Sequence, residues 1–528
     1  MGGTSKDSEY GPASRPMNAL GSVEHSVGSA HSGGGSGDSV DTSESTERPQ
    51  ESLIHPRSGS ELQQPNEKKS ASSFCSTDSP RSRAWYLAVW SKLVSDDRRF
   101  VWLVATFAAG VQAVILWRFW SRGPAFVEDF EDGDIARNLI EGKGYVAGTD
   151  WLTPPFQPTA HKTPGWVFVL AGIYKAFGRS QVPVTILNAA LLVLLYCICF
   201  AFFRKWTNAS VAKAATVLLL ASPFLIKQGR SALNVPASAV LILAYLWLVT
   251  ETAETGSSKR ALATGLVGGA LLLVHPAAAA FVPATFWYVL RPSPLQRAET
   301  RAATRPSLRV KAVSIAIAAL VVVLAPWTIR NALVFRAFVP LGSSLPLEFA
   351  LGNGNTATGG LFTPAGIPIG EPPPEAVAYA RERGFNEVQA YNYYAWQAWE
   401  WVKGNPARAF QLRLLAATYY FFPQNLFYSV YRSDPGFLRN LAYTLVLVGF
   451  GLPGMALAWR RYPRLRPAVH AVLWSALLYA MTHANVDAKY REPVDPLLSG
   501  FAAIFLYEAV CWIQRKYEER RQGRSSPA

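Results

Sequence analysis

Apolar stretches of membrane-spanning length dominate this sequence. They are residues 100–119, 182–203, 209–226, 233–250, 259–275, 276–291, 310–329, 437–459, 468–484 and 494–514. A spanning helix needs about 20 mostly apolar residues, and in lipid a helix satisfies its own backbone hydrogen bonds. The stretches therefore predict an all-α polytopic membrane protein with about 10 transmembrane helices.

Lysine and arginine residues predict the direction of each span. "DDRR" precedes the first span, and "RKW" at 204–206, "KR" at 259–260, the arginine-rich segment 291–311, "RRYPRLR" at 460–466 and the final "QRKYEERRQGR" all fall on that same side. The positive-inside rule assigns this side to the cytosol. We therefore expect a multi-pass protein of the plasma (inner) membrane with both termini cytosolic. Segment 259–291 could be one broken helix or a tight hairpin, and a hairpin keeps the orientation of the later spans consistent.

Composition separates a polar front end from the membrane domain. Residues 1–82 are rich in Ser, Gly, Glu and Pro and show no apolar period, so they predict a disordered cytosolic tail. The membrane domain then covers 95–515, and a basic cytosolic tail follows at 516–528. The net charge of +15 does not indicate a nucleic-acid partner, because the basic residues cluster where apolar runs end.

Two long segments remain on the side opposite the cytosol. Residues 120–181 and 330–436 hold most of the motif-like polar residues. The stretch "GWVFVLAGIYKAF" at 165–177 is apolar but too short to span, so it predicts an interfacial helix within the first of these loops. The acid-rich "EDFEDGD" at 128–134 therefore lies at the outer membrane surface.

The acids of the first loop are candidates for acid–base chemistry. A helix beginning at Glu131 would place Asp132 on its apolar stripe and Glu131 at the edge, while Asp134 would lie on the solvated face. An inward-facing carboxylate suits a general base that deprotonates an acceptor hydroxyl. We therefore take Glu131, Asp132 and the preceding Asp129 as candidates. For any single acid the alternative is a structural role, because the helix macrodipole favours carboxylates in the first turn.

Four ordered blocks of sequence resemble the bacterial GT-C glycosyltransferases. "EDGDIARNLIEGKGY" followed by "PTAHKTPGWVFVLAGIYKAFG" is similar to the first extracytoplasmic loop of that group. The later blocks are "APWTIRNALVFRAFVPLGSSLPLEFALGN" (325–353), "NEVQAYNYYAWQAWEWVKGNPARAFQLRL" (386–414) and "AKYREPVDPLL" (488–498). The branch resembled is glycosyltransferase family 39-like, related to the protein mannosyltransferases and the aminoarabinose transferases.

This resemblance implies a GT-C-like fold, with two long extracytoplasmic loops that carry juxtamembrane helices. It also implies a transferase that moves a sugar from a polyprenyl-phosphate donor to an extracytoplasmic protein, lipid or envelope glycan. Base-assisted attack opposite the leaving group would invert the sugar carbon. An acid of the first loop is the catalytic base in that family. The position within "FEDGDIA" makes Glu131 the best match, whereas the aminoarabinose-type pattern points one helical turn earlier, to Glu128 or Asp129.

A lipid-phosphate leaving group requires charge-assisted contacts. Lys162 lies where the aminoarabinose-type enzymes have a lysine before proline. Arg491, together with Tyr490 and Lys489, lies in the short last loop, and Arg330 ends a span. The alternative for each cation is snorkelling at a helix end. That alternative fits Arg330 best and Lys162 least, because the segment around Lys162 is polar and rich in turns.

Other features are assigned to structure rather than to chemistry. The outer loops lack a His/Cys ligand set, so no cofactor is expected, although carboxylates alone can bind Mg²⁺ or Mn²⁺. His161 is interpreted as a loop hydrogen-bonding residue and His483 as a helix-end residue. The aromatics of 392–401 suit an interfacial belt or, alternatively, the stacking of an acceptor sugar.

The main alternative function is a transporter or flippase of lipid-linked or envelope precursors. Such proteins place ionisable residues and broken helices near the bilayer midplane, often in internal repeats. This sequence has almost no charge inside its predicted spans and no evident repeat. A third interpretation, a scaffold with an interaction tail, accounts for the first 82 residues but not for the loop motifs.

Overall fold

A computed structural model describes residues 96–120, 131–147, 157–229, 231–291, 306–360, 372–422, 436–483 and 488–524. The chain divides into two units, residues 1–74 and 75–528, and all of the described residues lie in the second unit. The predicted tail, Glu128 and Asp129 lie outside the described residues. Within them, the regular structure is helical apart from a single β-bridge between Val146 and Pro158.

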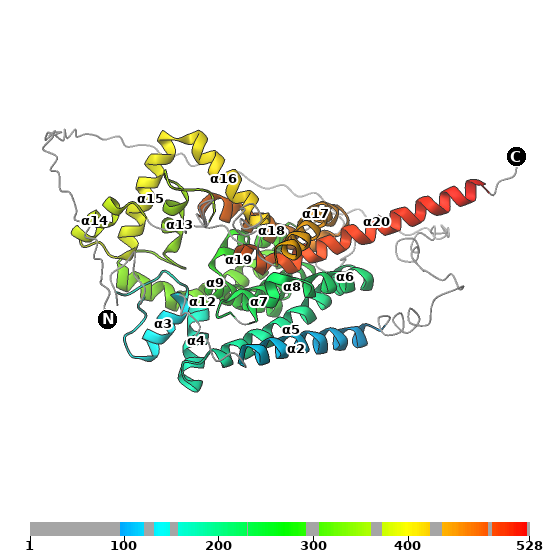
Figure 1. The fold of residues 1–528 in the computed structure, drawn as a ribbon, viewed down its shortest axis with the longest axis horizontal. Coiled ribbons are helices and arrows are strands. Elements are labelled where there is room, and N and C mark those ends of the chain that lie inside the picture. Colours follow the sequence, from blue (N-terminus) through cyan, green and yellow to red (C-terminus); the bar gives the residue numbers. More distant parts are fainter. Residues whose placement is uncertain are drawn as a thin grey trace, which may run out of the picture. The chain divides into compact units, whose positions relative to one another are not determined.

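Six of the described helices are long and apolar enough to cross a membrane (Figure 1). They are α2 (Asp97–Trp120), α5 (Gln181–Trp206), α8 (Val235–Thr255), α12 (Pro306–Phe335), α17 (Phe437–Arg461) and α20 (Asp495–Arg524). Their length and composition confirm the prediction of an all-α, multi-pass membrane protein.

The remaining predicted spans are shorter or broken. The helices there are α6 (Ala209–Leu220), α7 (Pro223–Gln228), α9 (Ser258–Val274), η1 (Pro276–Ala280), α10 (Val282–Leu290) and α18 (Arg466–Thr482). Between α6 and α7 the chain breaks at Ser222, whose side chain caps a new helix that starts with Pro223. Helices α9 and α18 have 17 residues each, about 26 Å at 1.5 Å per residue. The predicted count of about 10 spans is therefore not confirmed.

Small residues let the apolar helices approach one another closely. Helix α9 packs against α12 at Gly265, where an added Cβ would collide with the backbone carbonyl of Ala316. Helices α17 and α20 pack in the same way at Gly454, which faces the carbonyl of Phe501. In lipid, apolar side chains gain little by leaving the solvent, so helix association depends on such close packing.

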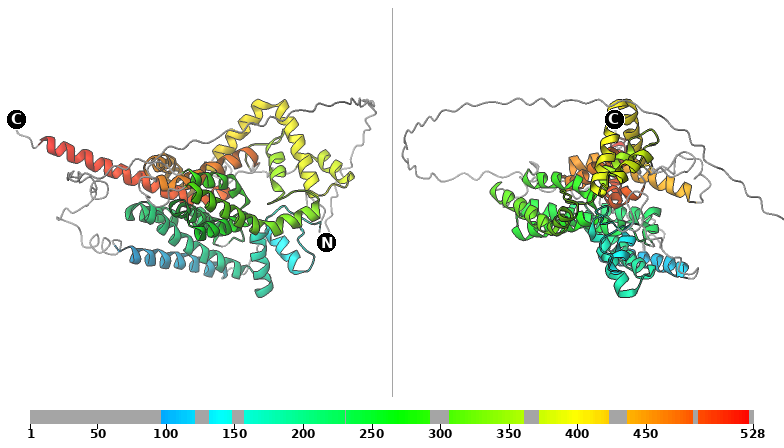
Figure 2. Two further views of the ribbon diagram at one scale, coloured as in Figure 1. Left: turned by 180° about the vertical axis from the view of Figure 1, so that it is seen from behind. Right: turned by 90° about the vertical axis from the view of Figure 1, so that its left-hand side faces the viewer.

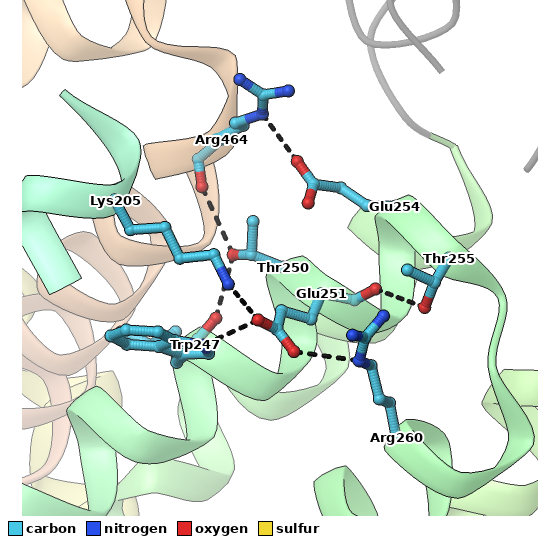
Figure 3. Close-up of polar contacts among 9 residues, drawn as sticks. Lys205, Trp247, Thr250, Glu251, Glu254, Thr255, Arg260 and Arg464 are labelled. Carbon is cyan, nitrogen blue, oxygen red and sulfur yellow. Dashed lines mark hydrogen bonds and ion pairs between the residues drawn. The ribbon is translucent and has the colours of Figure 1, made fainter. Parts of the chain in front are cut away.

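Charged helix ends meet in an ion-pair network (Figure 3). Lys205 near the end of α5 and Arg260 near the start of α9 both contact Glu251 of α8, the arginine at 3.0 Å. Arg464, just before α18, pairs with Glu254 at 2.6 Å. The structure therefore brings together the helix ends that the sequence assigns to one side. That this side faces the cytosol stays a prediction.

Shorter helices from the two predicted loops lie beyond the other ends of the long helices (Figure 1). They are α3 (Glu131–Ile140), α4 (Pro164–Phe177), α13 (Ser344–Gly352), α14 (Pro374–Glu382), α15 (Glu387–Gly404) and α16 (Pro406–Phe421). The last loop contributes α19 (Ala488–Arg491) and η5 (Glu492–Val494), and η4 (Pro463–Leu465) precedes α18. Helix α3 packs on α4, α13 on α15, and α16 on α18. Helix α4 is the short helix that the sequence predicts at 165–177 in the first loop.

The C-terminal part of α20 extends beyond its neighbours. Residues 512–520 are exposed, and the left view of Figure 2 shows this end of the helix projecting on its own. The predicted basic tail therefore begins as a continuation of α20, which runs to Arg524.

Candidate active site

A cavity of about 470 Å³ lies where helix ends from both predicted loops meet. Its polar or charged lining residues include Asp132, His161, Lys162, Glu348, His483 and Tyr490. Apolar residues from the end of α9, from η1 and from α13 complete the wall. Three residues that the sequence singled out are thus brought into the same cavity: Asp132 and Lys162 from the first loop, and Tyr490 from the last.

Helix α3 begins with acids in its first turn, where the macrodipole favours negative charge. Its apolar residue Ile135 is buried, and α3 packs on α4. Asp132, predicted to extend this apolar stripe, lines the cavity. The register predicted for Asp132 is therefore consistent with the structure.

Part of the α3 face that was predicted to be solvated is in fact buried. Asp134 is only 4% exposed and pairs with Arg137 at 2.9 Å. Asn138 is fully buried, and its Nδ2 donates to the carbonyl of Val146 at 3.0 Å. The prediction that Asp134 is a surface charge was therefore wrong. Burial raises the pKa of the Tyr174 phenol in α4 and the nearby charge of Asp134 adds to that effect, so this part of α3 is covered where α3 packs on α4.

The carboxylate of Glu131 forms an ion pair with the next segment of the first loop. Lys162 Nζ contacts its Oε2, and His161 Nε2 lies 3.5 Å from its Oε1. Burial opposes ionisation, but the charges of Lys162 and His161 outweigh it and hold the pKa of Glu131 well below its usual range. Burial likewise opposes charge on the two partners, and the charge of Glu131 nevertheless raises the pKa of both.

Asp132 has a different electrostatic environment. Burial raises the pKa of its carboxyl group, and the positive charge of Lys162 only partly offsets that effect. The two acids therefore differ in kind. Glu131 is ion-paired and readily ionised, whereas Asp132 lines the cavity and is the stronger base. Asp129, the remaining candidate, lies outside the described residues.

The last loop contributes Tyr490 and Pro493 to the cavity. Tyr490 lines it, and its ring centroid lies 4.7 Å from that of Tyr479. Arg491 is fully buried; its Nε donates to Asp495 at 2.8 Å, and its Nη1 donates to a backbone carbonyl at the end of α16. The structure therefore does not bring Arg491 into the cavity, and its guanidinium group instead joins α16 to α20. The side chain of Lys489 lies outside the described residues.

Arg330 contacts the first loop rather than the cavity. Its Nη1 donates to the carbonyl of Thr159 at 2.7 Å, and its Nη2 donates to that of Tyr145 at 3.2 Å. The guanidinium also lies 5.1 Å from the ring centroid of Trp327. These contacts fasten the segment just before Lys162 to α12, which gives Arg330 a positioning role.

The sequence analysis missed Glu387, which joins the two predicted loops. This side chain begins α15, is 2% exposed and accepts a hydrogen bond from Thr159 Oγ1. It also accepts from the backbone N–H of Ala160 at 2.8 Å and from Ser343 Oγ at 2.5 Å. A carboxylate this deeply buried requires such donors. Glu387 thereby fixes the segment that carries Lys162 against the start of α13.

Within the described parts of the chain, no group of three or more His, Cys, Asp or Glu side chains is arranged to hold a metal ion. The expectation that the protein needs no cofactor stays a prediction. The polar lining of the cavity includes carboxylates, a lysine, histidines, tyrosines, and the side chains of Thr163, Asn234 and Ser344.

Residues 161–329 match the family described as dolichyl-phosphate-mannose-protein mannosyltransferase. The match starts at His161, beside Lys162, and runs through most of α12. It confirms the resemblance to the GT-C glycosyltransferases that the four sequence blocks indicated. No curated protein matches the sequence.

Solved structures of two membrane glycosyltransferases are similar to the chain. ArnT from Cupriavidus metallidurans bound to undecaprenyl phosphate aligns with a TM-score of 0.44 and 15% identity, over 78% of this chain and 60% of that one. An oligosaccharyltransferase from Archaeoglobus fulgidus in the apo form aligns with a TM-score of 0.43 and 13% identity, over 82% of this chain and 53% of that one. ArnT from Cupriavidus metallidurans in the apo state aligns with a TM-score of 0.34 and 15% identity, over 79% of this chain and 78% of that one. The chain thus spans less than two thirds of the length of the first two.

Proposed function

We propose that this protein is a membrane glycosyltransferase that moves a sugar from a polyprenyl-phosphate donor to an acceptor hydroxyl. The observation that carries the proposal is the meeting of Asp132 and Lys162 in one cavity between the two predicted loops. This transfer requires a carboxylate to accept a proton and a cation to hold a phosphate. The name of the matched family includes a sugar on a dolichyl phosphate, which is a donor of this class.

In the proposed reaction, a carboxylate takes the proton of the acceptor hydroxyl while that oxygen bonds to the anomeric carbon. The bond from this carbon to the phosphate oxygen breaks, and the electron pair leaves with the polyprenyl phosphate. Attack from the side opposite the phosphate inverts the sugar carbon. We assign the base to Asp132, because it lines the cavity and burial raises the pKa of its carboxyl group.

Lys162 is the proposed partner of the donor phosphate. It lines the cavity and is held by Glu131, which keeps the lysine charged despite its burial. A fixed ammonium group stabilises the negative charge that develops on the leaving phosphate. In this arrangement Glu131 is a positioning residue for Lys162 and not the base itself.

We further propose that the cavity faces the extracytoplasmic side of the plasma membrane, with both termini cytosolic. The basic residues Lys205, Arg260 and Arg464 lie together at the helix ends assigned to the other side (Figure 3). This distribution is what the positive-inside rule expects. The acceptor would accordingly be a protein, lipid or envelope glycan outside the cytosol.

Release of polyprenyl phosphate tests the proposed function directly. The purified full-length protein is incubated with a panel of polyprenyl-phosphate sugars and extracytoplasmic acceptors. We expect release from at least one donor, and Asp132→Asn should slow turnover by roughly two to four orders of magnitude. The exposed Glu141, just after α3, provides a matched control as Glu141→Gln. Absence of release with every donor, or lipid movement without release, would favour the transporter or flippase alternative.

A further inference from the structure

The cavity contains another carboxylate, Glu348 of α13, to which neither the sequence motifs nor the proposed reaction gives a role. Its Oε2 atom is buried and accepts no hydrogen bond from any residue that the structure describes. A buried acceptor without a donor destabilises a fold, so such atoms are rare in native proteins and require an explanation. A ligand that brings its own donors is such an explanation.

The paired carboxylates of the site differ from Glu348 in this respect. Glu387 accepts hydrogen bonds from three donors, and Glu131 is paired with Lys162 and His161. Their hydrogen-bonding capacity is used by the protein itself. Among the carboxylates that the structure describes, Glu348 is therefore the one with a buried oxygen that accepts no hydrogen bond, and it lies beside the cavity.

Helix α13 holds Glu348 in a defined position. Leu347 and Leu351, four residues apart, are buried on one side of the helix, whereas Ser344 and Glu348, also four residues apart, line the cavity. Ser343, at the N-terminal end of α13, donates to Glu387. A side chain on a helix anchored in this way is suited to selecting a ligand by geometry.

Charge determines which part of the donor can approach Glu348. A phosphate is repelled by a carboxylate and attracted by Lys162, so the phosphate belongs at the lysine. The charge of Glu348 affects Lys162 less than the charges of Glu131 and Asp132 do. Sugar hydroxyls, in contrast, donate hydrogen bonds, and one carboxylate can accept from two of them.

We propose that Glu348 binds hydroxyl groups of the donor sugar and so selects among polyprenyl-phosphate sugars. This inference rests on the proposed function and adds the residue that recognises the transferred group. Because the polyprenyl phosphate product has no sugar, its binding should not depend on Glu348.

The test compares the wild type with Glu348→Ala, Glu348→Gln and the control Glu375→Gln. Glu375 is an exposed carboxylate in the first turn of α14, within the same predicted loop. For the best donor and for analogues that each lack one hydroxyl, KM and kcat are measured from polyprenyl phosphate release. The inhibition constant of polyprenyl phosphate and the unfolding temperature of each variant are measured in the same detergent.

We expect Glu348→Ala to raise KM for the parent donor by roughly 10- to 100-fold, the loss associated with a charged hydrogen bond. The ratio of kcat/KM for the parent donor to that for one deoxy analogue should fall by a similar factor in Glu348→Ala. In Glu348→Gln this ratio should lie between the values of Glu348→Ala and the wild type. The inhibition constant of polyprenyl phosphate and the behaviour of Glu375→Gln should match the wild type. Because the Oε2 of Glu348 accepts no hydrogen bond from the residues that the structure describes, both Glu348 variants should unfold at or above the wild-type temperature.

Several outcomes would overturn the inference. Unchanged KM and unchanged donor preference in an active enzyme would remove the role of Glu348 and leave the proposed function intact. Weaker binding of polyprenyl phosphate would place Glu348 at the phosphate, and a lower unfolding temperature would make it structural. Absence of release by the wild type would overturn the proposed function, and this inference with it.

Discussion

At the scale of single residues, ion pairing separates two acids that are neighbours in the sequence. Glu131 forms ion pairs with Lys162 and His161, whereas Asp132 lines the cavity. Adjacent residues on a helix point about 100° apart, so one can contact the loop while the other reaches a ligand. The consequence is a pair of carboxylates with pKa values shifted in opposite directions.

The pH dependence of kcat/KM distinguishes the two candidate bases. A base acts when ionised, so activity is lost as the pH falls through its pKa. With Asp132 as the base, we expect activity to be lost at a pH above the usual carboxyl range, because burial raises the pKa of Asp132. With Glu131 as the base, activity would be lost only at a pH well below that range. In Glu131→Gln the loss should move to lower pH, since the charge of Glu131 raises the pKa of Asp132. An acid limb that stays in place in this variant would contradict the assignment.

Removal of Lys162 should affect binding and chemistry together. Lys162→Ala takes away the proposed phosphate partner, so we expect higher KM, lower kcat and weaker inhibition by polyprenyl phosphate, each by about tenfold or more. It also removes a charge that lowers the pKa of Asp132, so the acid limb should move to higher pH. Kinetics and product inhibition at several pH values measure both effects. An unchanged inhibition constant would place the phosphate elsewhere.

The helical register predicts the acid segment and the resemblance of the first loop predicts Lys162, and the structure brings Asp132 and Lys162 to one cavity. The sequence could not predict that Glu387 would bind Thr159, which lies 228 residues away in the chain. Its error at Asp134 has a related cause. Helical periodicity separates a polar face from an apolar one, but it does not reveal that a neighbouring helix such as α4 will cover part of the polar face.

At the scale of elements, close packing between α17 and α20 provides a test of the bundle. An added Cβ at Gly454 would collide with the carbonyl of Phe501, whereas nothing lies within 4 Å of one at Gly449 on the same helix. Overpacking of this kind costs about 1–3 kcal/mol. We therefore expect Gly454→Val to lower the unfolding temperature by several degrees in detergent, with Gly449→Val close to the wild type. Equal effects of the two variants would show that α17 and α20 do not pack in this way.

Element boundaries were predicted best where the sequence carries strong local signals. The apolar stretches became helices, whereas the capping box of Asn386 and Gln389 at the start of α15 is a local signal that the sequence analysis did not use. The stretch 209–226 was expected to be one span, but Ser222 and Pro223 begin a new helix within it. A serine before a proline is itself a helix-start signal, so this break was readable from the sequence.

At the scale of the whole molecule, two groups of contacts lie at opposite ends of the same helices. Lys205 and Glu251 pair at the C-terminal ends of α5 and α8, while the N-terminal residue of α8, Val235, lines the cavity. The direction of each helix is thus coupled to that of its neighbours. If one end of the bundle is cytosolic, the cavity lies at the other end.

Topology reporters test this coupling together with the proposed location of the chemistry. Fusions after residues 205 and 463 adjoin the ends of α5 and α17, and a fusion after residue 300 precedes α12, so all three should report the cytosol. Fusions near 150 and 370 interrupt the two predicted loops and should report the opposite side. Because the ion pairs to Glu251 and Glu254 join α5, α8, α9 and the start of α18, these helices cannot be inverted one at a time without breaking the network. Cytosolic signals at both 150 and 205 would contradict the coupling between helix directions. A reversal of the signal at all five positions would place the cavity on the cytosolic side and contradict an extracytoplasmic acceptor.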